Sequence, residues 1–169
     1  MSLRPIDLNP KEVQAIQSGQ NLQIRRKVKP KSGGEIRGWG GNAIAMEEIP
    51  SNEPDTQHFR TVVCPYGQVG DRLFVREAFS TKIRNVGGTP HESFAYKADK
   101  PDEMEYFDCN GKGRPIKWKP APRMPRVASR LILEIQEISV VPKNPTSTAS
   151  QPNPFMWAIK FVVIQGGVA

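Results

Sequence analysis

The sequence has 169 residues, 37% hydrophobic and 24% charged, with a net charge of +7, which is typical of one globular domain over residues 1–169 that attracts anions. No apolar run approaches the roughly 18 residues of a membrane span, and residues 1–13 lack the apolar stretch of a signal peptide. The two cysteines, Cys64 and Cys109, form no CxxC pair, which excludes a disulfide framework and a zinc ribbon and predicts a reducing, cytoplasmic environment.

The N-terminal region predicts one helix, over about residues 10–18. Asn9 is a suitable N-cap, Pro10 suits the first helical position, and Glu12 stands where it would complete a capping box. Gly19 follows as a typical C-terminal stop. The helix is therefore expected to end just before the first strand.

The remaining chain predicts short strands joined by turns, because 16 prolines and 14 glycines disfavour a helical bundle. Residues 29–54 are expected to be irregular with room for a hairpin, residues 99–112 to form an acidic loop, and residues 143–152 a polar linker. The pattern of apolar residues places strands at 21–28, 59–63, 71–79, 92–97, 129–141 and 155–164, the last of them apolar on both faces.

The longest of these strands, residues 129–141, changes the phase of its apolar positions near Gln136 and Glu137. Such a change predicts a β-bulge, which is common where a barrel bends. One helix with five to seven short strands at irregular spacing favours a mostly β (α+β) fold. We expect a small, nearly closed, mostly antiparallel β-barrel with the helix flanking it.

Basic residues are concentrated in two segments of the chain. Six lysines and arginines lie in residues 25–37 with one acid, and seven lie in residues 112–130 with none. Such segregation can build a basic face that attracts phosphates, whereas the alternative is a pair of solvated loops. Arginine binds phosphate with a planar fork, and Trp118 could stack on a base. In the alternative, Trp118 and Met124 are core residues and the neighbouring cations extend into water.

Motifs for catalysis or metal binding are missing from the sequence. His58 and His91 are the two histidines, and neither stands at ligand spacing from a cysteine or from the other. No GxSxG, HExxH or phosphate-loop sequence occurs. We therefore expect neither a metal nor a cofactor.

Several segments follow one another in a recognisable order and span most of the chain. They are 19–26 (GQNLQIRR), 28–30 (VKP), 64–77 (CPYGQVGDRLFVRE), 96–99 (YKAD), 117–118 (KW), 124–130 (MPRVASR) and 153–157 (NPFMW). In these segments the sequence resembles the phage and prophage proteins that carry an ASCH domain, a member of the PUA-like superfamily. The resemblance implies a small β-barrel with a cleft, RNA or modified-nucleoside binding, and a phage- or prophage-encoded protein in the cytoplasm of a bacterial host.

The sequence departs from the related ASCH enzymes that hydrolyse acylated cytidine. Those enzymes use a Gly-x-Lys-Thr-x-Thr-x-Arg segment whose lysine and second threonine work with a later glutamate. Here the lysine position is Asn21 and the second threonine position is Ile24, and no acid occurs in residues 143–152. Glu77 is the one carboxylate left to consider as a catalytic base, and beside Arg76 an ion pair is the simpler interpretation. We therefore expect no hydrolysis of acylated cytidine.

The leading hypothesis is a binding module for RNA, another single-stranded nucleic acid or a nucleotide-like ligand, held in a basic cleft. One alternative is an amidohydrolase acting on an acylated or modified nucleoside, with Glu77 as base. Another is a phage accessory protein whose basic face binds a protein partner. The residues expected to contact the ligand are Asn21, Gln23, Arg25, Arg26, Arg76, Lys117, Trp118, Arg123, Arg126 and Arg130.

Overall fold

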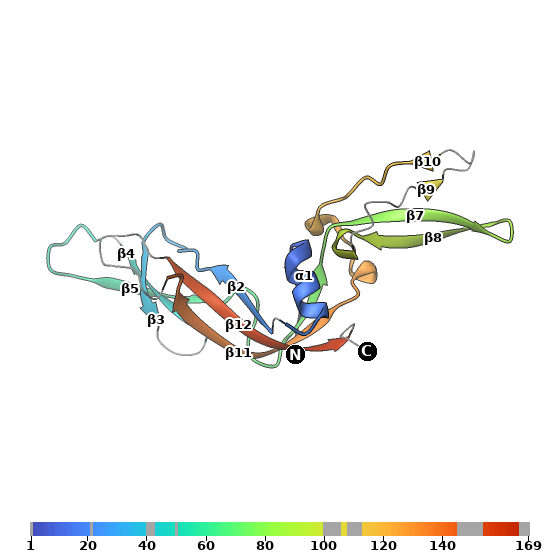
Figure 1. Ribbon diagram of the computed structural model, residues 1–169. Coiled ribbons are helices and arrows are strands. Elements are labelled where there is room, and N and C mark those ends of the chain that lie inside the picture. The colour runs from blue at the N-terminus through green and yellow to red at the C-terminus, as the bar shows by residue number, and fades with distance from the viewer. Residues whose placement is uncertain are drawn as a thin grey trace. The chain divides into compact units, whose positions relative to one another are not determined.

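A computed structural model describes residues 2–20, 22–39, 43–49, 51–99, 106–107, 113–144 and 154–165. The fold is mostly β with one α-helix, which confirms the predicted α+β class (Figure 1). The helix α1 spans Pro10–Gln17, and three 3₁₀ turns follow at η1 (Lys97–Asp99), η2 (Ala121–Arg123) and η3 (Arg126–Ala128). The strands are β1 Leu3–Asp7, β2 Gln23–Lys27, β3 Glu35–Trp39, β4 Ile44–Ile49, β5 His58–Val63, β6 Arg72–Arg76, β7 Phe79–Val86, β8 Thr89–Tyr96, β9 Tyr106–Phe107, β10 Gly113–Arg114, β11 Ile132–Pro142 and β12 Phe155–Gln165.

Helix α1 begins with the predicted capping box. Asn9 Oδ1 accepts a hydrogen bond from the backbone N–H of Glu12 at 2.9 Å, and Glu12 Oε2 accepts one from the N–H of Asn9 at 3.0 Å. The helix ends before Gly19, whose φ of +72° is a left-handed conformation that glycine adopts without strain. Both ends of α1 were therefore predictable from neighbouring residues.

The main sheet has five strands in the order β1-β6-β11-β12-β2. The predicted phase change in β11 is present, because Gln136 and Glu137 are consecutive exposed residues between buried positions on either side. The expected closed barrel is not detected in the described part of the chain. There the five-residue strands β1 and β2 are the two edges of the sheet, and closure would require them to pair with each other.

The other strands form small antiparallel sheets. Strands β3, β4 and β5 lie in that order, so the region expected to be irregular with room for a hairpin contains the antiparallel pair β3–β4. Strands β7 and β8 pair over their full eight residues, and β9 pairs with β10. Strand β7 was not predicted from the sequence, since the strand predicted at 71–79 ends at the first residue of β7.

The described chain divides into two compact units, each assembled from distant parts of the sequence. Unit 1 comprises Met1–Arg4, Leu22–Arg72 and Glu134–Val162, and unit 2 comprises Pro5–Asn21, Leu73–Leu133 and Val163–Ala169. Each unit has its own set of buried apolar side chains. They include Ile24, Ile135, Trp157, Ile159 and Phe161 in unit 1, and Ile6, Val13, Ile16, Val75 and Leu131 in unit 2. Within the described residues, no helix combines the length and the apolar character that crossing a membrane requires.

Candidate nucleic-acid interface

Strand β2 holds three of the predicted ligand residues, Gln23, Arg25 and Arg26, and all three belong to unit 1. It pairs antiparallel with β12, with Arg25 opposite Ala158 and Arg26 opposite Trp157. Arg25 is exposed, and Arg26 Nη1 donates a hydrogen bond to the carbonyl oxygen of Arg25 at 2.8 Å. Gln23 is half-buried at the start of the strand, and Asn21 lies outside the described residues.

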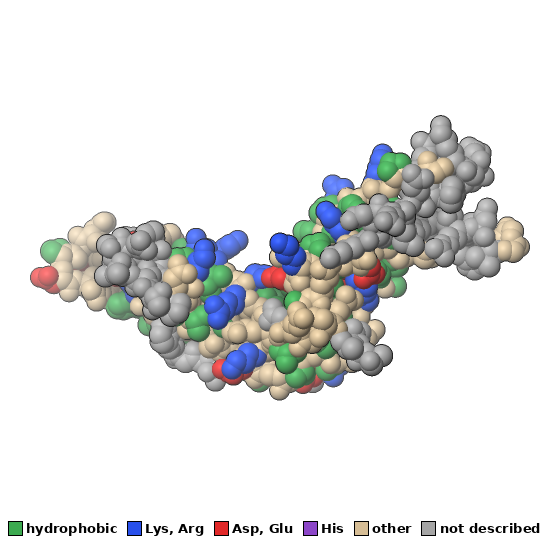
Figure 2. Space-filling model, viewed as in Figure 1, with side chains coloured by type: hydrophobic (Ala, Val, Ile, Leu, Met, Phe, Trp, Pro, Cys, Tyr) green, Lys and Arg blue, Asp and Glu red, His purple; other side chains and the backbone are tan. Residues whose placement is uncertain are grey.

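The second group lies in unit 2, on the segment between β10 and β11. Lys119 ties this segment to β7, because its N–H donates to the Phe79 carbonyl at 2.8 Å and its carbonyl accepts from the Phe79 N–H at 3.1 Å. The turns η2 and η3 follow directly, so the backbone is held in a defined conformation. In Figure 2, lysine and arginine side chains gather along this part of the chain.

Four exposed cations on this segment are here called the basic turn: Lys117, Lys119, Arg123 and Arg126. None of them forms an ion pair with a described residue. Lys119 Nζ lies 5.7 Å from the centre of the Phe79 ring, a weak cation–π contact. Lys119 was not among the residues predicted to contact the ligand, although it lies beside Trp118 in the same basic segment.

Trp118 and Met124, the two apolar residues of this segment that were predicted to lie either in the core or at the ligand, have different surroundings. Met124 is buried with Phe79 and Ala128. Trp118 is half-buried. The alternative in which both are core residues is therefore confirmed for Met124. Part of the surface of Trp118 is exposed and available for contact.

Arg130 was predicted to contact phosphate, and the structure surrounds it with acids. Its Nε and Nη2 donate to the two carboxylate oxygens of Glu77 at 3.0 and 2.9 Å. Its Nη1 donates to Asp99 at 2.9 Å, and its guanidinium carbon lies 4.0 Å from the ring centre of Tyr96. Every nitrogen of the guanidinium is thus occupied within unit 2.

Arg76 is also used internally. Its Nε donates to Asp7 Oδ1 at 2.6 Å, and its Nη1 to the carbonyl oxygen of Pro122 at 3.3 Å. The ion pair expected between Glu77 and Arg76 is therefore a pair between Glu77 and Arg130. Neighbouring residues on an extended chain point to opposite sides, which separates Arg76 from Glu77.

The Glu77 side chain is only 2% exposed. Burial raises the pKa of its carboxyl, while the hydrogen bonds and charge of Arg130 lower that pKa, and the net direction is upward. Because both oxygens accept from Arg130, neither is directed at a substrate. The geometry is that of a structural ion pair, which agrees with the simpler interpretation of the sequence.

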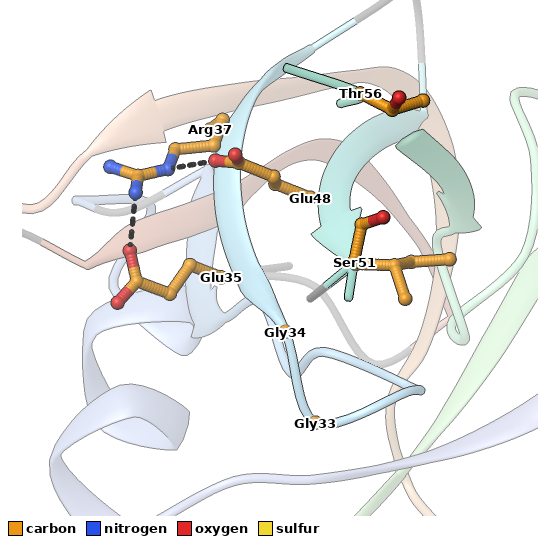
Figure 3. A pocket seen from close by; sticks show the side chains of 8 residues that line it. Gly33, Gly34, Glu35, Arg37, Glu48, Ser51 and Thr56 are labelled. Carbon is orange, nitrogen blue, oxygen red and sulfur yellow. Dashed lines mark hydrogen bonds and ion pairs between the residues drawn. The ribbon is translucent and has the colours of Figure 1, made fainter. Parts of the chain in front are cut away.

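A cavity of about 380 Å³ in unit 1 is lined by none of the predicted ligand residues. Figure 3 shows Arg37 between two acids that line this cavity, with Nε 2.6 Å from Glu48 and Nη2 2.9 Å from Glu35. The glycines Gly33 and Gly34 and the hydroxyls of Ser51 and Thr56 complete much of the lining. Two carboxylates around one arginine do not favour a phosphate ligand at this cavity.

Comparisons with protein-family models, curated proteins and solved structures find no match to this chain. Among the described residues, no three His, Cys, Asp or Glu side chains gather in a group that could hold a metal ion. The function must therefore be inferred from the geometry of the chain itself.

Proposed function

We propose that this chain is an ASCH-like binding module of phage or prophage type whose basic turn contacts the phosphates of RNA or a related single-stranded nucleic acid. The observation that carries the proposal is the arrangement of the basic turn. Four exposed cations stand on a segment that is hydrogen-bonded to β7, with no carboxylate partner among the described residues.

The contrast with other arginines supports this proposal. Arg37, Arg72 and Arg76 each form an ion pair with a nearby carboxylate. Arg130 has two such partners. Acids neutralise these four arginines, whereas no described acid neutralises the cations of the basic turn. Cations on a defined backbone attract phosphate oxygens at a lower entropic cost than cations on a disordered loop.

Trp118 adds a second kind of contact to the basic turn. It lies between two exposed lysines and is itself only half-buried. An aromatic face beside cations suits a single strand, because unpaired bases can stack while the phosphates meet the charges.

Binding is favoured over hydrolysis by the surroundings of the residues that an enzyme would need. Ile24, at the second threonine position of the resembling enzymes, is buried and has no hydroxyl. Glu77 has both oxygens engaged by Arg130. A general base must lie within hydrogen-bond distance of the proton that it removes. Glu77 is held away from a substrate by Arg130, and Ile24 has no group that could exchange a proton.

The test is oligonucleotide binding by Arg123→Gln/Arg126→Gln, measured by fluorescence anisotropy over a series of salt concentrations. Each phosphate contact on a single strand contributes about 0.7 to the slope of log affinity against log salt, so we expect the slope to fall by about 1.4. Because phosphate contacts carry no sequence information, the loss should be similar for RNAs of different sequence.

The matched control is Arg4→Gln/Lys11→Gln, which removes the same charge from exposed residues outside the basic turn. Its slope should stay close to that of the wild type. The proposal fails if the wild type binds no oligonucleotide at low salt, or if the two double variants lose equal slope.

A further inference from the structure

Strand β2 carries a second series of cations, on the face opposite to Ile24. Ile24 and Val28 are buried, whereas Arg25, Lys27 and Lys29 are exposed, so burial alternates along the chain from β2 into the next residues. We call Arg25, Lys27 and Lys29 the β2 row. None of these three side chains forms an ion pair with a described residue, and Figure 2 shows basic side chains gathered over this strand.

The spacing of the β2 row suits a chain of phosphates. Alternate residues on a strand are about 6.6 Å apart, which is close to the distance between successive phosphates of an extended nucleic-acid strand. A duplex winds its phosphates around an axis, so a straight row of cations keeps fewer of them in reach. An extended single strand can follow the whole row.

The position of β2 at the edge of its sheet adds backbone donors. Hydrogen bonds from Val28 N–H to Phe155 and from Phe161 N–H to Leu22 show that the even-numbered residues of this segment pair with β12. The N–H groups of Arg25 and Lys27 therefore point away from β12. Backbone N–H groups beside cations are common ligands of phosphate oxygens.

The chain that follows the β2 row is anchored by a buried acid. The Glu47 carboxylate accepts hydrogen bonds from the N–H groups of Lys31, Ser32 and Gly34 at 2.9, 2.8 and 2.9 Å. A side chain at Gly34 would collide with the carbonyl oxygen of Glu48, so the loop follows one tight path. Glu47 thereby fixes the exposed Lys31 two residues beyond the β2 row.

We infer that the β2 row with Lys31 is a second phosphate-binding surface, made of residues other than those of the basic turn, that selects an extended single strand over a duplex. Glu47 is its positioning residue. The inference rests on the proposed function for the class of ligand. Of these residues, Arg25 was already expected from the sequence to contact the ligand, whereas Lys27, Lys29 and Lys31 were not.

Arg25→Gln/Lys27→Gln tests this surface against single-stranded and duplex RNA of the same sequence and length. We expect the salt slope for the single strand to fall by about 1.4, and the ratio of single-strand to duplex affinity to fall with it. Arg4→Gln/Lys11→Gln is again the matched control. A poly-glutamate peptide of equal charge is added as a competitor and should displace the single strand poorly.

The outcomes separate this inference from the proposed function. If the basic-turn variant loses slope while the β2 variant behaves as the control, the second surface is overturned and the proposed function stands. Equal losses for single strand and duplex would overturn the selectivity, and displacement by poly-glutamate at the same charge concentration would favour an acidic protein partner. Failure of the wild type to bind any RNA overturns both proposals.

Glu47→Gln tests the positioning role. The amide keeps the size of the side chain but turns one acceptor into a donor that faces backbone N–H groups. We expect a lower salt slope for single-stranded RNA, as Lys31 loses its fixed place, while the basic-turn contribution persists. Glu47→Asp, which retains the carboxylate, should recover part of the slope. If neither variant changes the slope, Glu47 does not position Lys31 for binding and has only a structural role.

The pH dependence gives an independent readout of Glu47. Burial by itself raises the pKa of this carboxyl, but the three N–H donors lower it below the ordinary value of 4.5. A carboxyl whose pKa is lowered by folding contributes stability above its ordinary pKa and loses it as the pH falls through the folded value. The stability difference between wild type and Glu47→Gln should thus be full at neutral pH and shrink below 4.5.

Discussion

Arg130→Met is expected to lower the free energy of unfolding by about 3 kcal/mol, because it leaves the buried Glu77 carboxylate without its cation. Both Glu77 oxygens lose a donor, and Glu77 is only 2% exposed. Asp99 is half exposed and can return to water, so it contributes less to the loss. Chemical denaturation of the two proteins at neutral pH measures the difference.

The pH profile of this variant follows from the same pair. The pKa of Glu77 is already raised by burial above its ordinary value of 4.5, and Arg130 is the main group that lowers it. Removing Arg130 raises that pKa further. A carboxyl with a raised pKa contributes stability below its ordinary pKa and loses it as the pH rises through the folded value. The destabilisation should therefore be larger at neutral pH than at pH 4.5.

Glu77→Leu/Arg130→Met provides the control, since it removes both charges together. Replacing a buried pair by apolar residues is often nearly neutral, so the double variant should recover much of the loss seen in Arg130→Met. Losses that simply add would contradict the pairing. At temperatures where Arg130→Met is folded, its salt slope for RNA should equal that of the wild type. In the wild type the Arg130 guanidinium is already bound by Glu77 and Asp99, so it contributes no phosphate contact.

Features governed by neighbouring residues could be predicted from the sequence. The caps of α1 depend on Asn9 and Glu12, three residues apart, and the sequence alone indicated both. The phase change at Gln136 and Glu137 likewise shows in the local order of apolar residues. Strand β2 was indicated by alternation, although its neighbour in the sheet, β12, lies far along the chain.

Features that depend on residues far apart in the chain could not be predicted from the sequence. Arg130 meets Asp99 across 31 positions and Glu77 across 53, so no local pattern distinguishes it from the exposed arginines before it. Glu47 is an unremarkable acid in its strand until the loop 13 to 16 residues earlier folds onto it. Closure of a barrel is of the same kind, because it depends on whether β1 and β2 pair.

The same contrast between local and distant information applies to the basic turn. The sequence placed the cations of the basic turn in one segment with Trp118 and Met124, but it left two roles open for these two apolar residues. Burial against Phe79 and Ala128 decides the role of Met124. Trp118 is half-buried, which allows either a core role or stacking on a base, and a measurement of binding and stability distinguishes the two roles.

Met124→Ala should lower the free energy of unfolding by about 3 kcal/mol, since it opens a cavity in a cluster where Met124 is only 4% exposed. Trp118→Ala should instead weaken binding of single-stranded RNA by about 1–3 kcal/mol and leave the salt slope nearly unchanged, because a stacked ring holds a base and carries no charge. Thermal unfolding and anisotropy, measured on both variants, separate these effects. If Trp118→Ala lowers the melting temperature as much as Met124→Ala does and binds RNA like the wild type when folded, Trp118 belongs to the core and the basic turn acts through charge alone.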